Sequence, residues 1–271
     1  MTHSSGQAAQ GHSDAAHAAA RTIRVRIKRQ DKPASGSYWE TFEVAHEAGM
    51  NVTSVLQRIA ADPTPVGRQA PTTPVAYDAA CLEEVCGSCT MVINGRVRQG
   101  CTALVDRLLE DVPGEITIEP MSKFPVIRDL CVDRSRMFAD LKRAHCWIDV
   151  DGYYHRGPGP KLPPKVQDEA YPLSRCMTCG CCVEACPQFN EHSDFIGPAV
   201  ISQIILFNSH PTGASAADER LAVLTGKGGI AECGNSQNCV KVCPKDIPLT
   251  TSIARAGRDA TRFAFRRWRN R

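Results

Sequence analysis

Two stretches of the sequence share one pattern of cysteines. Residues 176–187 read CMTCGCCVEACP, and residues 233–244 read CGNSQNCVKVCP. The first stretch has the spacing C-x2-C-x2-C-x3-C-P of bacterial two-cluster ferredoxins, in which the fourth cysteine binds the other cluster. The second stretch matches it except that Ser236 stands where its second cysteine belongs. This internal repeat predicts a domain that holds two iron–sulfur clusters.

Cross-ligation divides these cysteines between two sites, because the last cysteine of each stretch serves the cluster of the other. The site that we call the middle site is predicted to hold a 4Fe–4S cluster. Its ligands are Cys176, Cys179, Cys182 and Cys243. The site that we call the last site keeps only three thiolates, which are Cys186, Cys233 and Cys239.

The last site is predicted to hold a 3Fe–4S cluster, because a cubane with three cysteine ligands tends to lose its unliganded iron. Its reduction potential should be the higher one, since fewer anionic ligands stabilise its oxidised form less. The alternative is a 4Fe–4S cluster with the Ser236 alkoxide on the fourth iron. That alternative is less favoured because alcohols are poor ligands at neutral pH.

A third group of cysteines lies earlier in the chain. Residues 81–89 read CLEEVCGSC, and a further cysteine follows at position 101. The spacing C-x4-C-x2-C with a distant fourth cysteine is that of plant-type 2Fe–2S ferredoxins. The ligands of this first site are predicted to be Cys81, Cys86, Cys89 and Cys101. Structural zinc is the alternative, disfavoured because zinc sites prefer paired C-x2-C units.

Three of the fourteen cysteines stand outside these motifs. Cys131 and Cys146 are predicted to be buried small apolar residues. Cys181 lies beside Cys182 but out of phase with the repeat, so it is predicted not to be a ligand. The first twenty residues lack the apolar core of a secretory signal, which argues against a disulfide framework for these thiols.

The remaining sequence predicts an α+β fold of two domains. Residues 21–130 are expected to form the 2Fe–2S domain, with strands and a hairpin at Asn94-Gly95, a dipeptide suited to a type I′ turn. Apolar positions at helical spacing predict a helix over residues 51–61. Residues 171–271 are expected to form the helical two-cluster domain. Its expected helices cover residues 198–207, 217–224 and 249–265.

The two domains are predicted to be joined by residues 131–170, a helix followed by a Pro/Gly-rich linker in which Pro163-Pro164 marks a stiff, extended connection. Residues 1–20 read as a disordered tail.

Composition and pattern exclude several classes of function. The net charge of +3 is too small for a nucleic-acid binder. No run approaches the roughly 18 apolar residues that cross a bilayer, so contact with a membrane is expected only through a partner. No Ser/His/Asp or paired-carboxylate arrangement stands out, and no catalytic residue is predicted.

The order of the motifs resembles that of the iron–sulfur subunit of succinate dehydrogenase and fumarate reductase, over residues 21–265. Residues 81–90, CLEEVCGSCT, and residues 239–245, CVKVCPK, are similar to signatures of that family. The resemblance implies a β-grasp 2Fe–2S domain followed by an all-α domain. It implies electron transfer from FAD in a flavoprotein subunit, via the 2Fe–2S, 4Fe–4S and 3Fe–4S clusters, to a quinone at a membrane anchor that carries haem b. The expected location is the cytoplasmic face of the bacterial inner membrane.

Two departures indicate the menaquinone-linked branch of the family. The segment after Cys186 carries no tryptophan, and Gly234 stands where ubiquinone-linked members often have histidine.

Succinate oxidation is the expected direction. Fumarate reduction is the alternative, because both reactions use the same series of clusters. A free soluble ferredoxin is an alternative of another class. Cluster subunits of the glycerol-3-phosphate or glycolate type resemble the second half only, and Ser236 and the first site argue against them.

Overall fold

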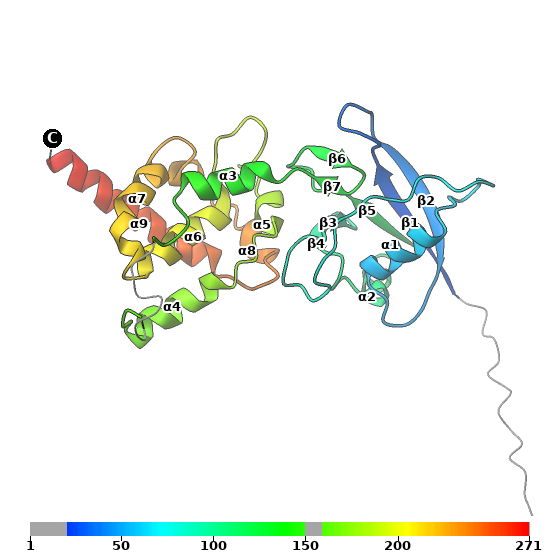
Figure 1. The fold of residues 1–271 in the computed structure, drawn as a ribbon, viewed down its shortest axis with the longest axis horizontal. Helices are drawn as coiled ribbons and strands as arrows, with labels where there is room; N and C mark the ends of the chain where they lie inside the picture. The colour runs from blue at the N-terminus through cyan, green and yellow to red at the C-terminus, as the bar shows by residue number, and fades with distance from the viewer. Residues whose placement is uncertain (1–20, 150–158, 271) are drawn as a thin grey trace, which may run out of the picture.

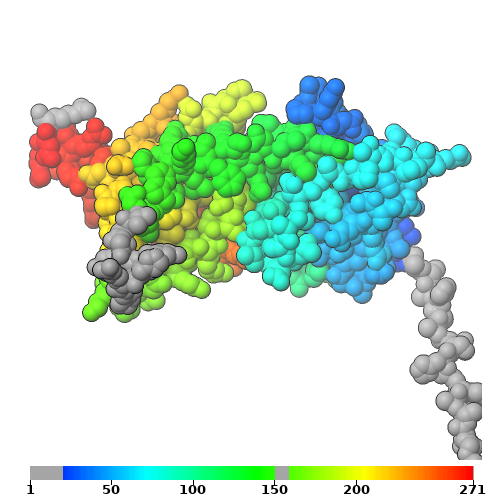
Figure 2. Space-filling model, viewed as in Figure 1, coloured from blue at the N-terminus to red at the C-terminus, as the bar shows by residue number. Residues whose placement is uncertain are grey.

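The computed structural model describes residues 21–149 and 159–270. These residues form a sheet-containing unit and a helical unit that lie side by side in one elongated molecule, as Figures 1 and 2 show. The arrangement confirms the α+β fold. The predicted tail of residues 1–20 and residues 150–158 of the predicted linker lie outside the described residues.

The sheet-containing unit is built on a five-stranded sheet with the order β2-β1-β5-β3-β4. Its strands are β1 (Thr22–Arg29), β2 (Tyr38–Ala45), β3 (Thr90–Ile93), β4 (Arg96–Gln99) and β5 (Glu115–Glu119). Strands β1 and β5 pair in parallel, and the other neighbours pair antiparallel. Along β1, Ile23, Val25 and Ile27 are buried while the basic residues between them are exposed or partly exposed, which is the alternation expected of a strand with one buried face.

Two helices complete this unit, α1 (Val52–Ala61) and α2 (Val105–Asp111). The predicted helix over residues 51–61 is confirmed. Asn51 caps α1, since its side-chain oxygen accepts a hydrogen bond from the Ser54 backbone N–H at 2.9 Å. The apolar side chains of α1 face the core beneath the sheet; they are Val52, Val55, Leu56 and Ile59.

A short connecting region leads to the helical unit. It contains a two-stranded ribbon, β6 (Val126–Arg128) with β7 (Cys131–Val132), and the helix α3 (Ser135–Arg143). The expectation of an extended connection at Pro163-Pro164 is wrong in part. Helix α4 (Pro164–Ser174) begins there with a proline in its first turn, a position where the missing N–H is not needed.

The helical unit surrounds one buried helix, α6 (Gly197–Ser209), which packs against α3, α4, α5, α7 and α9. The remaining helices are α5 (Cys181–Glu184), η2 (Gly213–Ala216), α7 (Ala217–Thr225), η3 (Ile230–Glu232), α8 (Asn238–Lys241) and α9 (Leu249–Arg269). The three helices predicted in this half are confirmed, with α9 longer than expected. Within the described ranges, none of the helices has the length and apolar character needed to cross a membrane.

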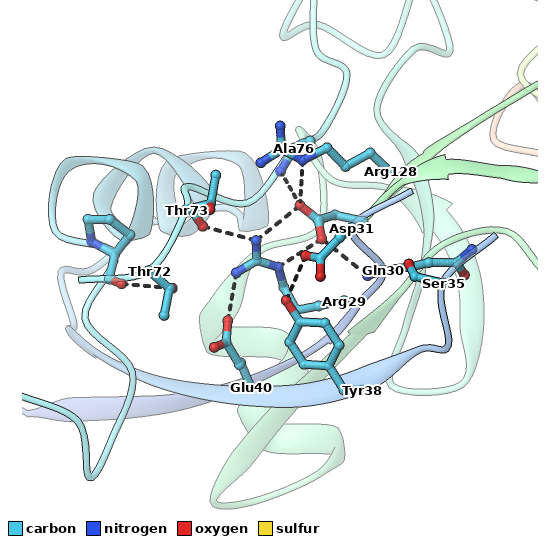
Figure 3. Close-up of polar contacts among 12 residues, drawn as sticks. Arg29, Gln30, Asp31, Ser35, Tyr38, Glu40, Thr72, Thr73, Ala76 and Arg128 are labelled. Atoms are coloured by element: carbon cyan, nitrogen blue, oxygen red, sulfur yellow. Dashed lines mark hydrogen bonds and ion pairs between the residues drawn. The ribbon is translucent and has the colours of Figure 1, made fainter. Parts of the chain in front are cut away.

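A buried ion-pair network holds in place the loop that precedes Cys81. Arg29 is 1% exposed and Asp129 is fully buried. Arg29 donates to Asp129 at 2.8 Å, to Glu40 at 2.6 Å and to the Thr73 carbonyl at 2.9 Å. Figure 3 shows its guanidinium with dashed lines to Glu40 and Thr73. Asp129 also accepts from the Ala76 backbone N–H at 2.9 Å. Burial lowers the pKa of Arg29, but its hydrogen bond and ion pair with Asp129 outweigh this, so the pKa rises above its ordinary value.

Replacing Arg29 with methionine is expected to destabilise the sheet-containing unit by about 3–5 kcal/mol, because it removes the buried cation that Asp129 and Glu40 share and leaves them only longer ion pairs with more exposed arginines. The matched control is Arg68→Met. Arg68 also pairs with Glu40, at 3.5 Å, but its side chain is 58% exposed, so its loss should cost roughly 0–1 kcal/mol. Urea unfolding followed by far-ultraviolet circular dichroism measures both, and equal effects would contradict this prediction.

Candidate iron–sulfur sites

The first site is built at the open end of the β3–β4 hairpin. Cys89 directly precedes β3, and Cys101 follows β4. Thr90 pairs with Gln99 across the hairpin, and the Gly100 backbone N–H donates to the Cys89 carbonyl at 2.9 Å. The predicted hairpin at Asn94-Gly95 is confirmed, and it brings the two buried cysteines to the same edge.

The loop that carries Cys81 and Cys86 surrounds their sulfur atoms with backbone donors. The Sγ of Cys81 lies 3.3 Å from the backbone nitrogens of Val85 and Cys86. The Sγ of Cys86 lies 3.4 Å from the backbone nitrogen of Ser88. Hydrogen bonds from Ser88 lower the pKa of Cys86 to about 6. Such N–H groups stabilise negatively charged sulfur, so the loop fits an anionic iron–sulfur cluster.

The four cysteines predicted for the middle site line one cavity in the helical unit. Cys176 and Cys179 lie between α4 and α5, Cys182 lies in α5, and Cys243 follows α8. Positive φ angles at Thr178 (54°) and Gly180 (92°) turn the chain around the cavity.

The three cysteines predicted for the last site line a separate cavity together with Ser236. Cys186 follows α5, Cys233 follows η3, and Cys239 lies in α8. The structure therefore brings together the cysteines of each predicted set and separates the two sets.

The sequence repeat is also a structural repeat. Helices α5 and α8 occupy the same four positions of the two cysteine stretches, and they contact each other. Each begins after a residue with positive φ, Gly180 at 92° and Gln237 at 59°. The matching geometry explains how each stretch contributes cysteines to the lining of both cavities.

Burial makes free thiolates unfavourable at three of the seven cysteines of these cavities, whereas a hydrogen bond with Cys181 lowers the pKa of Cys179 to about 7. Burial raises the pKa of Cys176 and Cys239, and it raises that of Cys182 well above its ordinary value. Thiolates at these positions therefore need positive charge beside them, and bound iron would supply it. Among the described residues, no three His, Cys, Asp or Glu side chains converge closely enough to hold a single metal ion; the cysteines surround cavities instead.

None of the three cysteines outside the motifs lines either cavity of the helical unit, although the Cys181 thiol is hydrogen-bonded to Cys179. Cys131 and Cys146 are partly buried rather than buried as predicted, and burial raises their pKa to about 11 and about 12. Cys181 is fully buried, and its Sγ lies 3.2 Å from the side-chain nitrogen of Gln99 in β4.

A further group of residues links the first site to the middle site, and no sequence motif predicts it. Arg134 donates to the Gly87 carbonyl at 3.0 Å and lies 3.5 Å from the Cys179 carbonyl. Nothing in the spacing of the cysteines points to Arg134 or Gln99, because both act across a large sequence separation.

Two family models match the chain in the predicted order. The model described as "2Fe-2S iron-sulfur cluster binding domain" matches residues 24–139, and the "4Fe-4S dicluster domain" model matches residues 172–247. In the solved Sdh1 complex of Mycobacterium smegmatis in its apo form, one chain has the same fold. Its TM-score is 0.70 at 22% identity, and the match covers 89% of this chain and 96% of that one.

Two curated relatives match most of the chain. The succinate dehydrogenase iron–sulfur subunit of Bacillus subtilis is 55% identical over 246 residues, which are 91% of this chain and 95% of the relative. The fumarate reductase iron–sulfur subunit of Wolinella succinogenes is 28% identical over 238 residues, 86% and 95% of the two chains. The resemblance found in the sequence is confirmed, and the chain belongs to the family of iron–sulfur subunits of succinate dehydrogenases and fumarate reductases.

Proposed function

We propose that this chain is the electron-transfer subunit of a succinate dehydrogenase. The first site would hold a 2Fe–2S cluster through Cys81, Cys86, Cys89 and Cys101. The middle site would hold a 4Fe–4S cluster through Cys176, Cys179, Cys182 and Cys243, and the last site a 3Fe–4S cluster through Cys186, Cys233 and Cys239. The observation that carries the ligand assignment is the division of seven cysteines between two cavities in the cross-ligated pattern.

When bound, the clusters supply carriers that accept and release one electron at a time. The chain's own residues hold and tune them. Backbone N–H groups around Cys81 and Cys86 stabilise negative charge at the first site. Apolar side chains such as Ala199, Ile247 and Leu249 line the middle cavity and limit access of water, which influences reduction potential. The chain thus serves as a scaffold for electron transfer and needs no acid or base of its own.

The partners that we propose are a flavoprotein subunit with FAD and a membrane anchor with haem b and a quinone, of the menaquinone type. The relative at 55% identity is a succinate dehydrogenase subunit, which favours succinate oxidation; fumarate reduction is the reverse alternative. The loop of the first site exposes Leu82 (50%) and Val85 (59%), apolar side chains suited to a protein partner.

We also propose that the chain lies peripherally on the cytoplasmic face of a bacterial inner membrane, held by the anchor. Helix α9 lies at the end of the molecule that is opposite the sheet-containing unit (Figure 1). Its last turns carry Arg266, Arg267 and Arg269 together with the exposed Phe265 and Trp268, a composition suited to a membrane surface. Fractionation of cells tests this placement: recovery of the assembled protein in the supernatant would contradict it.

The test of the proposed sites is a substitution at Ser236, which lines the last cavity with Cys186, Cys233 and Cys239. Ser236→Cys is expected to supply the missing thiolate, convert a 3Fe–4S cluster to 4Fe–4S, and lower the potential of the last site. Iron should rise by about one atom per chain, and the electron paramagnetic resonance signal of oxidised 3Fe–4S should disappear.

Ser236→Ala is the matched control. It removes the hydroxyl and should leave the 3Fe–4S signal unchanged, because the hydroxyl is not a ligand in this proposal. If Ser236→Ala instead lost an iron atom, the Ser236 alkoxide would be a ligand. Metal and acid-labile sulfide analysis of the wild-type protein is the wider test, and zinc in place of iron and sulfide would reject all three sites.

A further inference from the structure

We propose that Gly87 is a spacing residue, whose missing side chain lets the loop of the first site touch the loop of the middle site and thereby sets the electronic coupling between them. The inference rests on the proposed function, because it concerns the clusters that these loops would hold. Gly87 is not itself a ligand, and the spacing of the cysteines assigns it no part in the contact between sites.

The contact between the two loops is direct and involves backbone atoms. A Cβ atom built on Gly87 would lie 2.7 Å from both Cα and Cβ of Cys179 and 3.2 Å from its backbone nitrogen. Gly87 lies between the predicted first-site ligands Cys86 and Cys89, and Cys179 is a predicted ligand of the middle site. A side chain at position 87 would therefore have to push apart the segments that carry the two clusters, since no flexible side chain is there to yield.

Hydrogen bonds on both sides of this contact hold the loops together. The Gly87 carbonyl accepts from the Thr90 hydroxyl at 2.8 Å and from Arg134 Nη1 at 3.0 Å. The same Nη1 atom lies 3.5 Å from the Cys179 carbonyl. Arg134 thus contacts one carbonyl group in each loop, directly beside the place where the loops touch.

A second, buried set of hydrogen bonds also joins the sheet-containing unit to the helical unit. Gln99 in β4 is 1% exposed, and its side-chain nitrogen lies 3.0 Å from the Thr90 hydroxyl and 3.2 Å from the Sγ of Cys181 at the start of α5. Since buried polar groups tolerate little loss of their partners, the link leaves the two units little freedom to slide. It also gives Cys181 a role as a contact residue rather than a ligand.

Glycine at position 87 satisfies two requirements that a control can separate. Its φ is +70°, which disfavours any other residue, and it also makes the close contact with Cys179. Gly95 in the β3–β4 hairpin has the same φ of +70° but has nothing within 4 Å of a Cβ atom. Gly95→Ala therefore reproduces the backbone strain of Gly87→Ala without the contact.

The experiment uses the purified complex with its flavoprotein and anchor, carrying Gly87→Ala or Gly95→Ala. Electron paramagnetic resonance reports the content of each cluster and the magnetic interaction between the reduced first and middle sites, which falls steeply with their separation. Gly87→Ala is expected to keep the clusters, weaken the interaction and slow succinate–quinone reduction, with succinate–dye reduction at the flavin unchanged. Gly95→Ala is expected to match the wild type in every readout.

An unchanged magnetic interaction in Gly87→Ala with intact clusters would overturn the inference. Should Gly87→Ala fail to assemble its first cluster, Arg134→Met decides, because it removes the hydrogen bonds between the loops without altering either loop. It is expected to weaken the interaction in the same direction, because Arg134 holds the two loops at the close approach that Gly87 permits. An unchanged interaction would overturn the inference that this loop contact sets the coupling. A wild-type complex without these cluster signals would instead reject the proposed function, so the two failures are distinguishable.

Discussion

Replacing Cys86 with alanine is expected to abolish succinate–quinone reduction while the flavoprotein of the same complex continues to reduce an artificial dye. Cys86 is proposed as a ligand of the first site, and its Sγ is held by the backbone N–H of Ser88 at 3.4 Å. Alanine leaves that site with three thiolates, and the hydroxyl of Ser88, whose side chain is hydrogen-bonded to Cys86, is a poor ligand at neutral pH. Because the dye takes electrons directly from the flavin, the loss should fall only on the steps that follow it.

The measurement is the ratio of quinone reductase to dye reductase activity in purified complex of equal FAD content. The matched control is Cys131→Ala, which removes a partly buried cysteine that lies outside every cysteine motif; it should leave the ratio unchanged. Unimpaired quinone turnover in the Cys86→Ala complex would contradict the proposed order of electron transfer.

The parts of the structure that could be predicted from sequence are those encoded locally. Asn94-Gly95 adopts positive φ at both positions, 48° and 70°, as a type I′ turn requires. The repeat of the cysteine stretches also predicted which cysteines would share a cavity, because the ligand pattern of a two-cluster ferredoxin depends on spacing alone.

The contacts that join distant segments could not be predicted in this way. Strand β1 pairs in parallel with β5, although the alternation within each strand is compatible with other neighbours. Arg29 pairs with Asp129, a hundred positions later in the chain. Single arginine and aspartate residues carry no local sign of burial, so neither their ion pair nor the bridge at Arg134 has a sequence signature.

The start of α4 also could not be predicted from the residues next to it. Pro163-Pro164 is compatible with an extended linker and with a helix that begins at its second proline, because proline is acceptable in the first turn of a helix. The packing of α4 against α6 decides between these conformations, and that packing depends on residues 30 or more positions away.

Serine at position 182 is expected to remove the middle cluster, whereas serine at position 181, its neighbour in the chain, is expected to leave the iron content unchanged. Cys182 lines the middle cavity with Cys176, Cys179 and Cys243. An alcohol is a poor ligand for iron at neutral pH, so Cys182→Ser should lose about four iron atoms per chain, the content of one 4Fe–4S cluster. Cys181 does not line that cavity. Its Sγ lies within hydrogen-bonding distance of Gln99 and is hydrogen-bonded to Cys179, and a serine hydroxyl can make both hydrogen bonds.

Loss of the middle cluster should also destabilise the helical unit. Its cavity is lined by residues of α5 and α6, by the segments that follow α4 and α8, and by Leu249 at the start of α9, so a cluster there cross-links most of the unit. Free energy of metal binding to such a site is also free energy of folding, on the order of 10 kcal/mol for structural zinc. Iron and acid-labile sulfide analysis, with thermal unfolding followed by circular dichroism, should therefore separate Cys182→Ser from both Cys181→Ser and the wild type. Equal iron loss in the two variants would show that position 181 supplies a ligand and that the cross-ligated register proposed here is wrong.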